Sequence, residues 1–250
     1  MKWKLLAPAA LTGIFTLSTC KKDNSAPGNH AASLPKAMTK EVVSVWLGTQ
    51  KDSSLLSYDG ENRLTSIVSV TTPGFKITYQ YNSDNTVEMN ELSGQAEIYN
   101  KIWIGANHYA DSVYRYNNET DTTGTKYTYN ASNQLIQQQN YVYSHLVNPY
   151  PYPGNRYLYS YDNNGNATRE DNDLATTLYE YYTNLVNPFS LTSLETFVPM
   201  MKNLVKTETT ASGGSTLVIT HTYQFDDKNR LIEDAAVGDD GRSDIWRYYY

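Results

Sequence analysis

The sequence has 250 residues, with one cysteine and with 23 tyrosines against 5 phenylalanines. A single cysteine forms neither an internal disulfide nor the paired thiolates of a zinc ribbon or a Cys-x-x-Cys redox centre, so these classes are excluded. The formal net charge is −6 and no cluster of Lys and Arg occurs, which argues against nucleic acid as a partner because phosphate groups bind clustered basic residues.

The amino-terminal segment has the pattern of a secretory signal. Lys2 and Lys4 form a basic start, and a largely apolar run of 13 residues extends from Leu5 to Leu17. A membrane-spanning helix needs about 20 apolar residues, so this run is too short to span. The segment that ends at Cys20 resembles the lipobox of bacterial lipoproteins, which implies cleavage before Cys20 and a lipid anchor on its thiol. An ordinary cleavable signal peptide is the alternative.

The sequence therefore divides into a signal peptide (1–19), a flexible tether (20–41) and a β domain (42–250). The tether contains Pro27, Gly28 and Pro35 among small residues and has no apolar period. The lipobox resemblance implies an outer-membrane lipoprotein of the bacterial cell envelope, facing either the periplasm or the cell surface. The expected partner is thus the membrane itself, reached through Cys20.

A seven-residue pattern recurs five times in the β domain, and we call it the Tyr-Asp turn. It has an aromatic residue, Asp or Asn, two free positions, Asn or Gly, one free position and an apolar residue. Asp or Asn at the second position accepts a hydrogen bond from a backbone N–H two residues further on, and the later Asn or Gly tolerates positive φ. The pattern predicts five β-hairpins. Their first two residues are Tyr58-Asp59, Tyr81-Asn82, Tyr129-Asn130, Tyr161-Asp162 and Phe225-Asp226.

Residues before each turn alternate as in strands with one packed and one solvated face, for example Tyr157, Tyr159 and Tyr161. One short helix is predicted from Phe189 to Met201, where apolar residues recur at helical spacing. In total we expect about 12 to 15 strands. Strands outside the turn copies are predicted at 42–47, 96–104, 109–116, 137–143, 176–182, 204–210 and 244–250.

The five copies resemble the YD repeats of Rhs-type proteins. Together with the signal and the tether, they resemble bacterial lipoprotein domains of unknown function that have a porin-like fold. This resemblance implies an all-β domain over residues 42–250, with a single antiparallel sheet curled into a barrel or half-barrel. The toxin-enclosing shell of Rhs proteins is not expected, since five copies are too few to build it.

No motif typical of a zinc protease, a nucleophile elbow, a dinucleotide-binding loop or a phosphate loop occurs in the sequence. We therefore expect no enzyme activity, no cofactor and no metal site. The segment from Asp162 to Asn166 superficially resembles a calcium loop, but Ala167 and Asp173 stand where an EF-hand needs Gly and Glu. His221 occupies a strand position that is apolar or aromatic in other copies, which predicts a packed imidazole.

Exposed tyrosines provide the candidate binding surface. Tyr143, Tyr150 and Tyr152 lie in or beside a proline-rich stretch, and such an aromatic loop can stack on sugars or on an envelope protein. Most other tyrosines are expected to pack across strands. We expect a non-enzymatic structural or binding scaffold. The alternatives are a glycan-binding or glycan-active surface protein and a barrel that spans the outer membrane.

Overall fold

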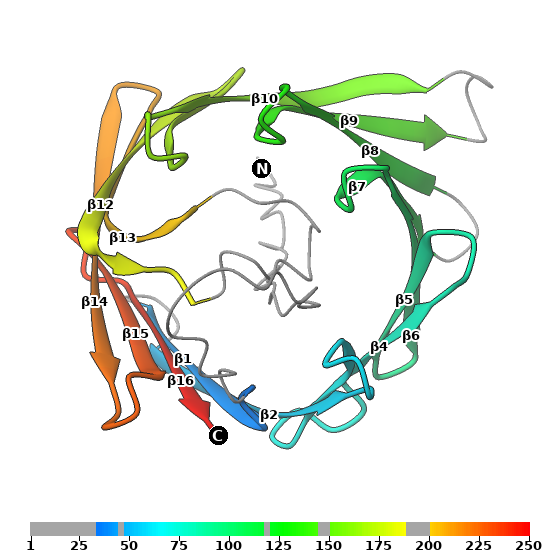
Figure 1. The fold of residues 1–250 in the computed structure, drawn as a ribbon, viewed down its shortest axis with the longest axis horizontal. Coiled ribbons are helices and arrows are strands. Elements are labelled where there is room, and N and C mark those ends of the chain that lie inside the picture. Colours follow the sequence, from blue (N-terminus) through cyan, green and yellow to red (C-terminus); the bar gives the residue numbers. More distant parts are fainter. Residues whose placement is uncertain (1–33, 45–47, 118–120, 145–150, 189–200) are drawn as a thin grey trace, which may run out of the picture.

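The computed structural model describes residues 34–44, 48–117, 121–144, 151–188 and 201–250, which form sixteen β-strands and no helix. Each strand pairs antiparallel with the next along the chain, and β1 pairs with β16, so the sheet closes into a barrel (Figure 1). The predicted single antiparallel sheet is confirmed, and of the two expected forms, barrel and half-barrel, it takes the closed barrel. Its sixteen strands are one more than the upper end of the expected 12 to 15. The strands are β1 (Ala37–Ser44), β2 (Gly48–Tyr58), β3 (Leu64–Ser69), β4 (Lys76–Tyr81), β5 (Thr86–Ser93), β6 (Ala96–Ile104), β7 (Ala110–Asn117), β8 (Asp121–Tyr129), β9 (Leu135–Ser144), β10 (Tyr152–Tyr161), β11 (Ala167–Asn172), β12 (Ala175–Val186), β13 (Asn203–Ser212), β14 (Ser215–Phe225), β15 (Leu231–Gly238) and β16 (Ser243–Tyr249).

Three details differ from the expectation or lie beyond it. β1 begins at Ala37, inside the segment predicted as tether, because residues there pair with both β2 and β16. Tyr152, Pro153 and Gly154 belong to β10, although their composition predicted a loop; the register shifts after Pro153, as is typical of proline within a sheet. The predicted helix lies outside the described residues except for Met201.

All five Tyr-Asp turns lie at one end of the barrel. Consecutive antiparallel strands alternate in direction, so every turn from an even-numbered strand to the following odd-numbered strand lies at the same end, which we call the turn end. The Tyr-Asp turns follow β2, β4, β8, β10 and β14. β1 starts and β16 ends there too, since Ala37 pairs with Tyr249. The chain that precedes β1 therefore joins the barrel at the turn end.

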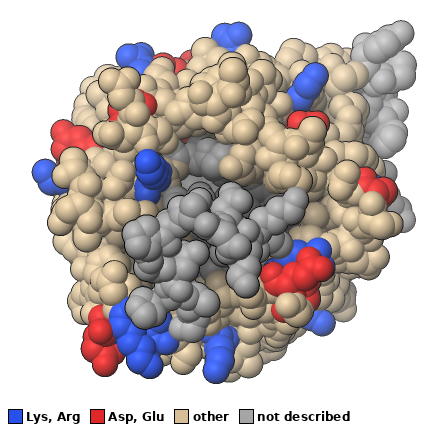
Figure 2. Space-filling model, in the orientation of Figure 1, with Lys and Arg blue, Asp and Glu red and all other residues tan. Residues whose placement is uncertain are grey.

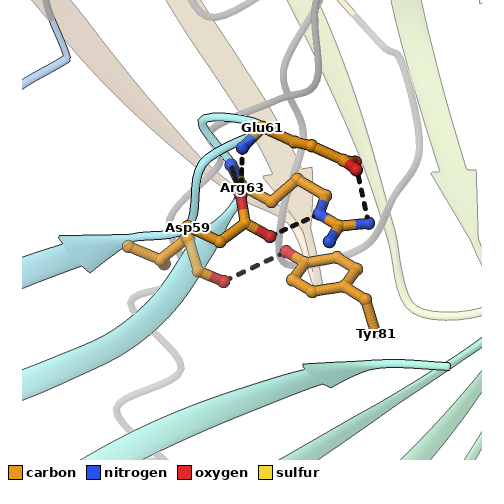
Figure 3. Close-up of polar contacts among 5 residues, drawn as sticks. Asp59, Glu61, Arg63 and Tyr81 are labelled. Atoms are coloured by element: carbon orange, nitrogen blue, oxygen red, sulfur yellow. Dashed lines mark hydrogen bonds and ion pairs between the residues drawn. The ribbon is translucent and has the colours of Figure 1, made fainter.

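The turn from β2 to β3 shows the local chemistry (Figure 3). Oδ1 of Asp59 accepts hydrogen bonds from the N–H groups of Glu61 and Arg63, both at 2.9 Å, and Asn62 has a φ of 61°. The Arg63 guanidinium donates to Oδ2 of Asp59 at 2.6 Å and lies 4.4 Å from the ring centroid of Tyr81. Burial raises the pKa of Asp59, but these hydrogen bonds outweigh it and hold the pKa below its ordinary value. Asn130, Asp162 and Asp226 accept the same pair of backbone hydrogen bonds.

Two turns depart from the pattern. After Tyr81, the carboxylate that accepts the backbone N–H of Thr86 belongs to Asp84 rather than to Asn82. A sixth turn of the same backbone form joins β6 to β7, where His108 has a φ of 66° and donates its N–H to the carbonyl of Gly105. The sequence did not reveal this turn because Gly105 has no side-chain acceptor and His108 stands in place of Asn or Gly.

Tyrosine hydroxyls tie successive turns together at the turn end. Tyr129, at the end of β8, donates to the carbonyl of Ala110 at the start of β7, at 2.7 Å. In each such bond, a tyrosine hydroxyl in or just after one strand donates to a backbone carbonyl at or near the start of the neighbouring strand. The bond therefore links two segments of the turn end that are separate in sequence. The other described bonds of this kind join Tyr58 to Pro35, Tyr81 to Leu64, Tyr181 to Ala167, Tyr223 to Val205 and Tyr250 to Leu231.

The apolar residue that completes each Tyr-Asp turn is part of the core. Leu64, Val87, Leu135, Ala167 and Leu231 are each at most 3% exposed. They are spaced around the turn end, at or beside the starts of β3, β5, β9, β11 and β15. Burial of an aliphatic side chain contributes about 1.5–3 kcal/mol, so this ring is a main source of stability.

The two faces of the sheet differ in burial. Directly paired residues lie on one face of a sheet, and the pairs Leu56–Ile67 and Tyr79–Met89 belong to the face that carries most of the buried side chains. Side chains converge on the concave face of a closed barrel, so this face is the inner wall. Residues that alternate with them, such as the exposed Leu55, form the outer wall.

Candidate functional site

A histidine lies between two carboxylates on the inner wall. Nε2 of His221, on β14, is 3.2 Å from Oε1 of Glu208 on β13, and its Nδ1 is 3.3 Å from Oδ1 of Asp234 on β15. The register explains the contact: Ala236 directly faces His221 and is small, so the imidazole can reach the diagonal neighbours. The ring of Tyr223 stacks on the imidazole with centroids 6.1 Å apart.

The carboxylates keep this histidine charged. Burial lowers the pKa of His221, but hydrogen bonds to Asp234 and Glu208, together with their charges, outweigh it and raise the pKa to about 9. At neutral pH the ring is therefore an imidazolium with no lone pair to accept a proton or bind a metal ion. The arrangement suits charge pairing and is a poor general base at neutral pH.

A further carboxyl lies on the same wall. Burial raises the pKa of Glu170 on β11, and the negative charge of Glu208 raises it further. Hydrogen bonds from the hydroxyls of Tyr179 and Tyr159 lower the pKa and partly offset this rise. The Tyr179 hydroxyl is 3.5 Å from Oε2 of Glu170. The inner wall from β10 to β15 thus carries carboxyl, phenol and imidazole groups on one continuous surface.

Two cavities open on the inner wall on either side of Trp246. One of about 360 Å³ lies over β1 to β4, where the apolar side chains of Met38, Ile67 and Phe75 supply much of its lining. The other, of about 330 Å³, lies over β13 to β16 and includes His221 with its carboxylates. The Nζ of Lys40 lies 4.4 Å from the ring centroid of Trp246 and 3.3 Å from Oδ2 of Asp244.

The outer wall carries a separate aromatic surface, the outer aromatic patch. It consists of Tyr99, Trp103, Tyr114, Tyr116 and Tyr143, from β6, β7 and β9. The ring centroids of Trp103 and Tyr114 are 5.2 Å apart, those of Tyr114 and Tyr143 are 5.6 Å apart, and those of Tyr99 and Tyr116 are also 5.6 Å apart. The Tyr143 hydroxyl donates to the Tyr114 hydroxyl at 3.2 Å.

Gly124 on β8 makes room for this patch. A Cβ at this position would lie 2.9 Å from Cε2 of Tyr143, so only glycine lets the ring lie flat against the strand. The isolated glycine within a strand and the Tyr-x-Tyr alternation at Tyr114 and Tyr116 are sequence signals that could have revealed the patch. The contacts of His221 had no such signal, because they join three strands diagonally.

The predicted surface of Tyr143, Tyr150 and Tyr152 is not assembled as expected. Tyr143 belongs to the outer aromatic patch, whereas Tyr152 pairs with Val142, the neighbour of Tyr143 that faces the opposite side of the sheet. Tyr150 and Cys20 lie outside the described residues. The five aromatic residues of the Tyr-Asp turns and their Asp or Asn partners lie at the turn end, and none of them lines either inner-wall cavity or belongs to the outer aromatic patch.

Neither a metal-ligand cluster nor a membrane-spanning helix is found in the described part of the chain. No group of three or more His, Cys, Asp and Glu side chains there is placed to hold a metal ion. No helix among the described residues is long and apolar enough to cross a bilayer.

The comparisons with known proteins identify the fold. The chain is similar to the crystal structure of a porin-like protein from Bacteroides uniformis, with a TM-score of 0.61 and 12% sequence identity over 87% of this chain and 98% of that one. A porin-like protein from Bacteroides vulgatus covers the same shares at 13% identity, with a TM-score of 0.43. No protein-family model matches the sequence, and no curated protein matches it. The chain therefore has the porin-like β-barrel fold.

Proposed function

We propose that this protein is a lipid-anchored protein of the bacterial cell envelope, and that its barrel is a non-enzymatic binding scaffold that stands outside the bilayer. The porin-like fold supports an envelope location. The lipobox resemblance at Cys20 supports the anchor. The observation that carries the proposal is the charge of the outer wall.

The outer wall carries ion pairs, which favour contact with water. Arg247 bridges two strands, with Nε 2.8 Å from Oε2 of Glu233 and Nη1 3.3 Å from Oε2 of Glu41. Arg169 and Asp171 form an ion pair at 2.6 Å in the short strand β11. A spanning barrel instead needs an outward apolar band about 25 Å tall, and Arg or Lys near its midplane costs about 2–4 kcal/mol.

Charges of both signs also surround the end of the barrel that Figure 2 shows. Figure 2 shows acidic and basic side chains scattered around the visible face, with no large area of one sign. Lys101 and Lys126 stand on the outer wall within β6 and β8, at strand positions that a bilayer core would cover. These positions favour an anchored barrel over a spanning one.

The lipid anchor can be separated from a spanning barrel by one pair of variants. We expect the wild-type chain to take up labelled fatty acid and to remain in washed membranes. Cys20→Ala, fused to a signal peptide that is cleaved without lipidation, should take up no label and appear folded in the aqueous phase. Ser18→Ala keeps Cys20 and serves as the control. Retention of the Cys20→Ala chain in alkali-washed membranes would overturn the proposal in favour of a spanning barrel.

A glycan-binding role is the second candidate, and the outer aromatic patch favours it. Tyr and Trp rings present flat apolar faces with polar edges, which suit stacking on sugar rings at low entropic cost. The patch extends along β6 and β7 from Trp103 to Tyr116 and across β8 to Tyr143 on β9, whereas the aromatic girdles of a spanning barrel run around the barrel at both interfaces.

Polysaccharide affinity electrophoresis tests this second candidate. A soluble glycan that slows the wild-type chain should no longer slow Trp103→Ala or Tyr114→Ala. The control is Tyr249→Ala, which removes an exposed tyrosine from β16. Equal retardation of all four proteins would show that the patch is not the binding surface.

A further inference from the structure

We propose that the inner wall around Trp246 binds an organic ammonium ion attached to an apolar body. This inference does not depend on how the protein is held in the envelope. It begins from the position of Trp246, which lines both inner-wall cavities. A ligand that lies across this ring therefore meets two different environments.

The cavity over β1 to β4 suits the apolar body. Met38, Val42, Ile67, Phe75 and Ile77 contribute to its lining, and its volume of about 360 Å³ falls within the range of small-molecule sites. Ser54, Gln50 and Thr72 supply polar atoms at its wall, and the charged residues Lys40, Lys51 and Asp52 also line it. A mostly apolar cavity with a few polar groups is the usual form of a ligand site.

The cavity over β13 to β16 suits the cationic head. Its lining contains more carboxylates than cations: Glu208, Asp234, Asp240 and Asp244 against His221 and Arg242. Part of this charge is internally paired, since Arg242 binds Asp240 at 2.5 Å, Lys40 lies 3.3 Å from Asp244 and His221 lies between Glu208 and Asp234. The remaining excess is negative, which excludes an anion as the favoured ligand.

A cation already lies at the boundary between the two cavities. The ammonium of Lys40 is 4.4 Å from the ring centroid of Trp246 and 3.3 Å from Oδ2 of Asp244. An indole face and a carboxylate together form a cation-binding surface. The contacts of the Lys40 side chain thus show that an ammonium group fits at this place.

The chemistry at the site favours an organic ammonium ion over a metal ion. No metal-ligand cluster occurs in the described residues, and His221 is an imidazolium at neutral pH. An ammonium group needs only a carboxylate and an aromatic face, and Asp244 and Trp246 present both on one wall, where the Lys40 ammonium contacts them.

Three probes with the same phenyl body and different charges test the proposal. Phenethylamine is a cation, 2-phenylethanol is neutral and 3-phenylpropionate is an anion at pH 7. Calorimetric titration into the full-length chain in maltoside micelles should show phenethylamine binding at least about tenfold more tightly than 2-phenylethanol, and no binding of the anion. Equal binding of the three probes, or no binding of the cation, would overturn the proposal.

Variants locate the site. Asp244→Asn should weaken phenethylamine binding at least about fivefold. Asp171→Asn is the matched control, because it removes a strand carboxylate of similar exposure that is also paired with a basic residue, but on the outer wall. Equal losses in the two variants would place the binding elsewhere.

Removal of the internal cation gives a second and opposite readout. Lys40→Met should tighten phenethylamine binding, since the ligand no longer competes with the Lys40 ammonium for Trp246 and Asp244. A purely structural role of these residues would not produce this gain. Weaker or unchanged binding in a folded Lys40→Met chain would contradict the proposal. This test does not depend on whether Asp244→Asn folds.

Discussion

At the turn end of the barrel, tyrosine hydroxyls and aspartate carboxylates bind backbone groups of the same sheet. On the inner wall of β13 to β16, carboxylates instead face a histidine, a lysine and open cavities. Asp59 accepts hydrogen bonds from two backbone N–H groups, whereas Oδ1 of Asp234 lies 3.3 Å from a side-chain imidazole, that of His221. Both regions are rich in Tyr and Asp, so composition does not distinguish them.

The difference lies in what each polar group satisfies. A turn carboxylate takes the place of water as the hydrogen-bond acceptor for backbone N–H groups. The fold needs this acceptor whether or not a ligand is bound. A carboxylate on the cavity wall is held by another side chain and can exchange that partner for a ligand. The turn end is therefore expected to set stability, and the inner wall to set pH dependence and binding.

The largest expected effect falls on the turn-end core. Leu64 is 0% exposed, so Leu64→Ala should lower the free energy of unfolding by about 3–4 kcal/mol through lost burial and a residual cavity. Urea unfolding followed by circular dichroism measures this. Leu158→Ala, at an outer-wall position 38% exposed, should cost less than about 1 kcal/mol. Equal costs would mean that the turn-end ring is not the core.

A smaller effect, and one that depends on pH, is expected on the inner wall. The pKa of His221 is about 9 in the folded chain against an ordinary value of 6.5, so its stabilisation is complete below about pH 6.5 and is lost as pH rises through about 9. Between pH 6 and pH 9.5 the wild-type chain should lose about 2–3 kcal/mol more than His221→Gln. Parallel pH profiles of the two chains in urea titrations would show that the imidazolium is not stabilised.

A third prediction concerns the tyrosine hydroxyls. Tyr129→Phe leaves the carbonyl of Ala110 without its 2.7 Å hydrogen bond and should cost about 1–2 kcal/mol. Tyr116→Phe removes a hydroxyl from an outer-wall residue that is 44% exposed, and should change stability by less than about 0.5 kcal/mol. Thermal unfolding of the two variants in parallel measures this difference. Indistinguishable midpoints would show that the turn-end hydrogen bonds do not stabilise the fold.

The smallest expected effect separates backbone from side chain in a Tyr-Asp turn. Asn229 has a φ of 58°, so Asn229→Ala should cost about 1 kcal/mol, while Asn229→Gly should be close to neutral. Urea midpoints compared at one pH are the measurement. A loss as large in the glycine variant would mean that the Asn229 side chain, rather than its backbone, matters.

Much of the fold could be predicted because its signals are local. The Asp or Asn at the start of a turn and the residue at positive φ act within five residues, as in the segment from Asp226 to Arg230. The sixth turn at Gly105 was missed since its backbone has the same form without the usual side chains. The candidate site could not be predicted in the same way, because Glu208, His221 and Asp234 meet only through the register of three strands.

The sequence by itself determined the class of the fold, the hairpin turns and the alternation of packed and solvated residues along each strand. The tertiary structure decided that the sheet closes: Arg247 and Glu41, 206 residues apart, meet across the seam between β16 and β1. It also decided which faces enclose cavities and which tyrosines form the outer aromatic patch. The physical reason is that turn chemistry acts over a few residues, whereas closure and cavities depend on the summed register of all sixteen strands.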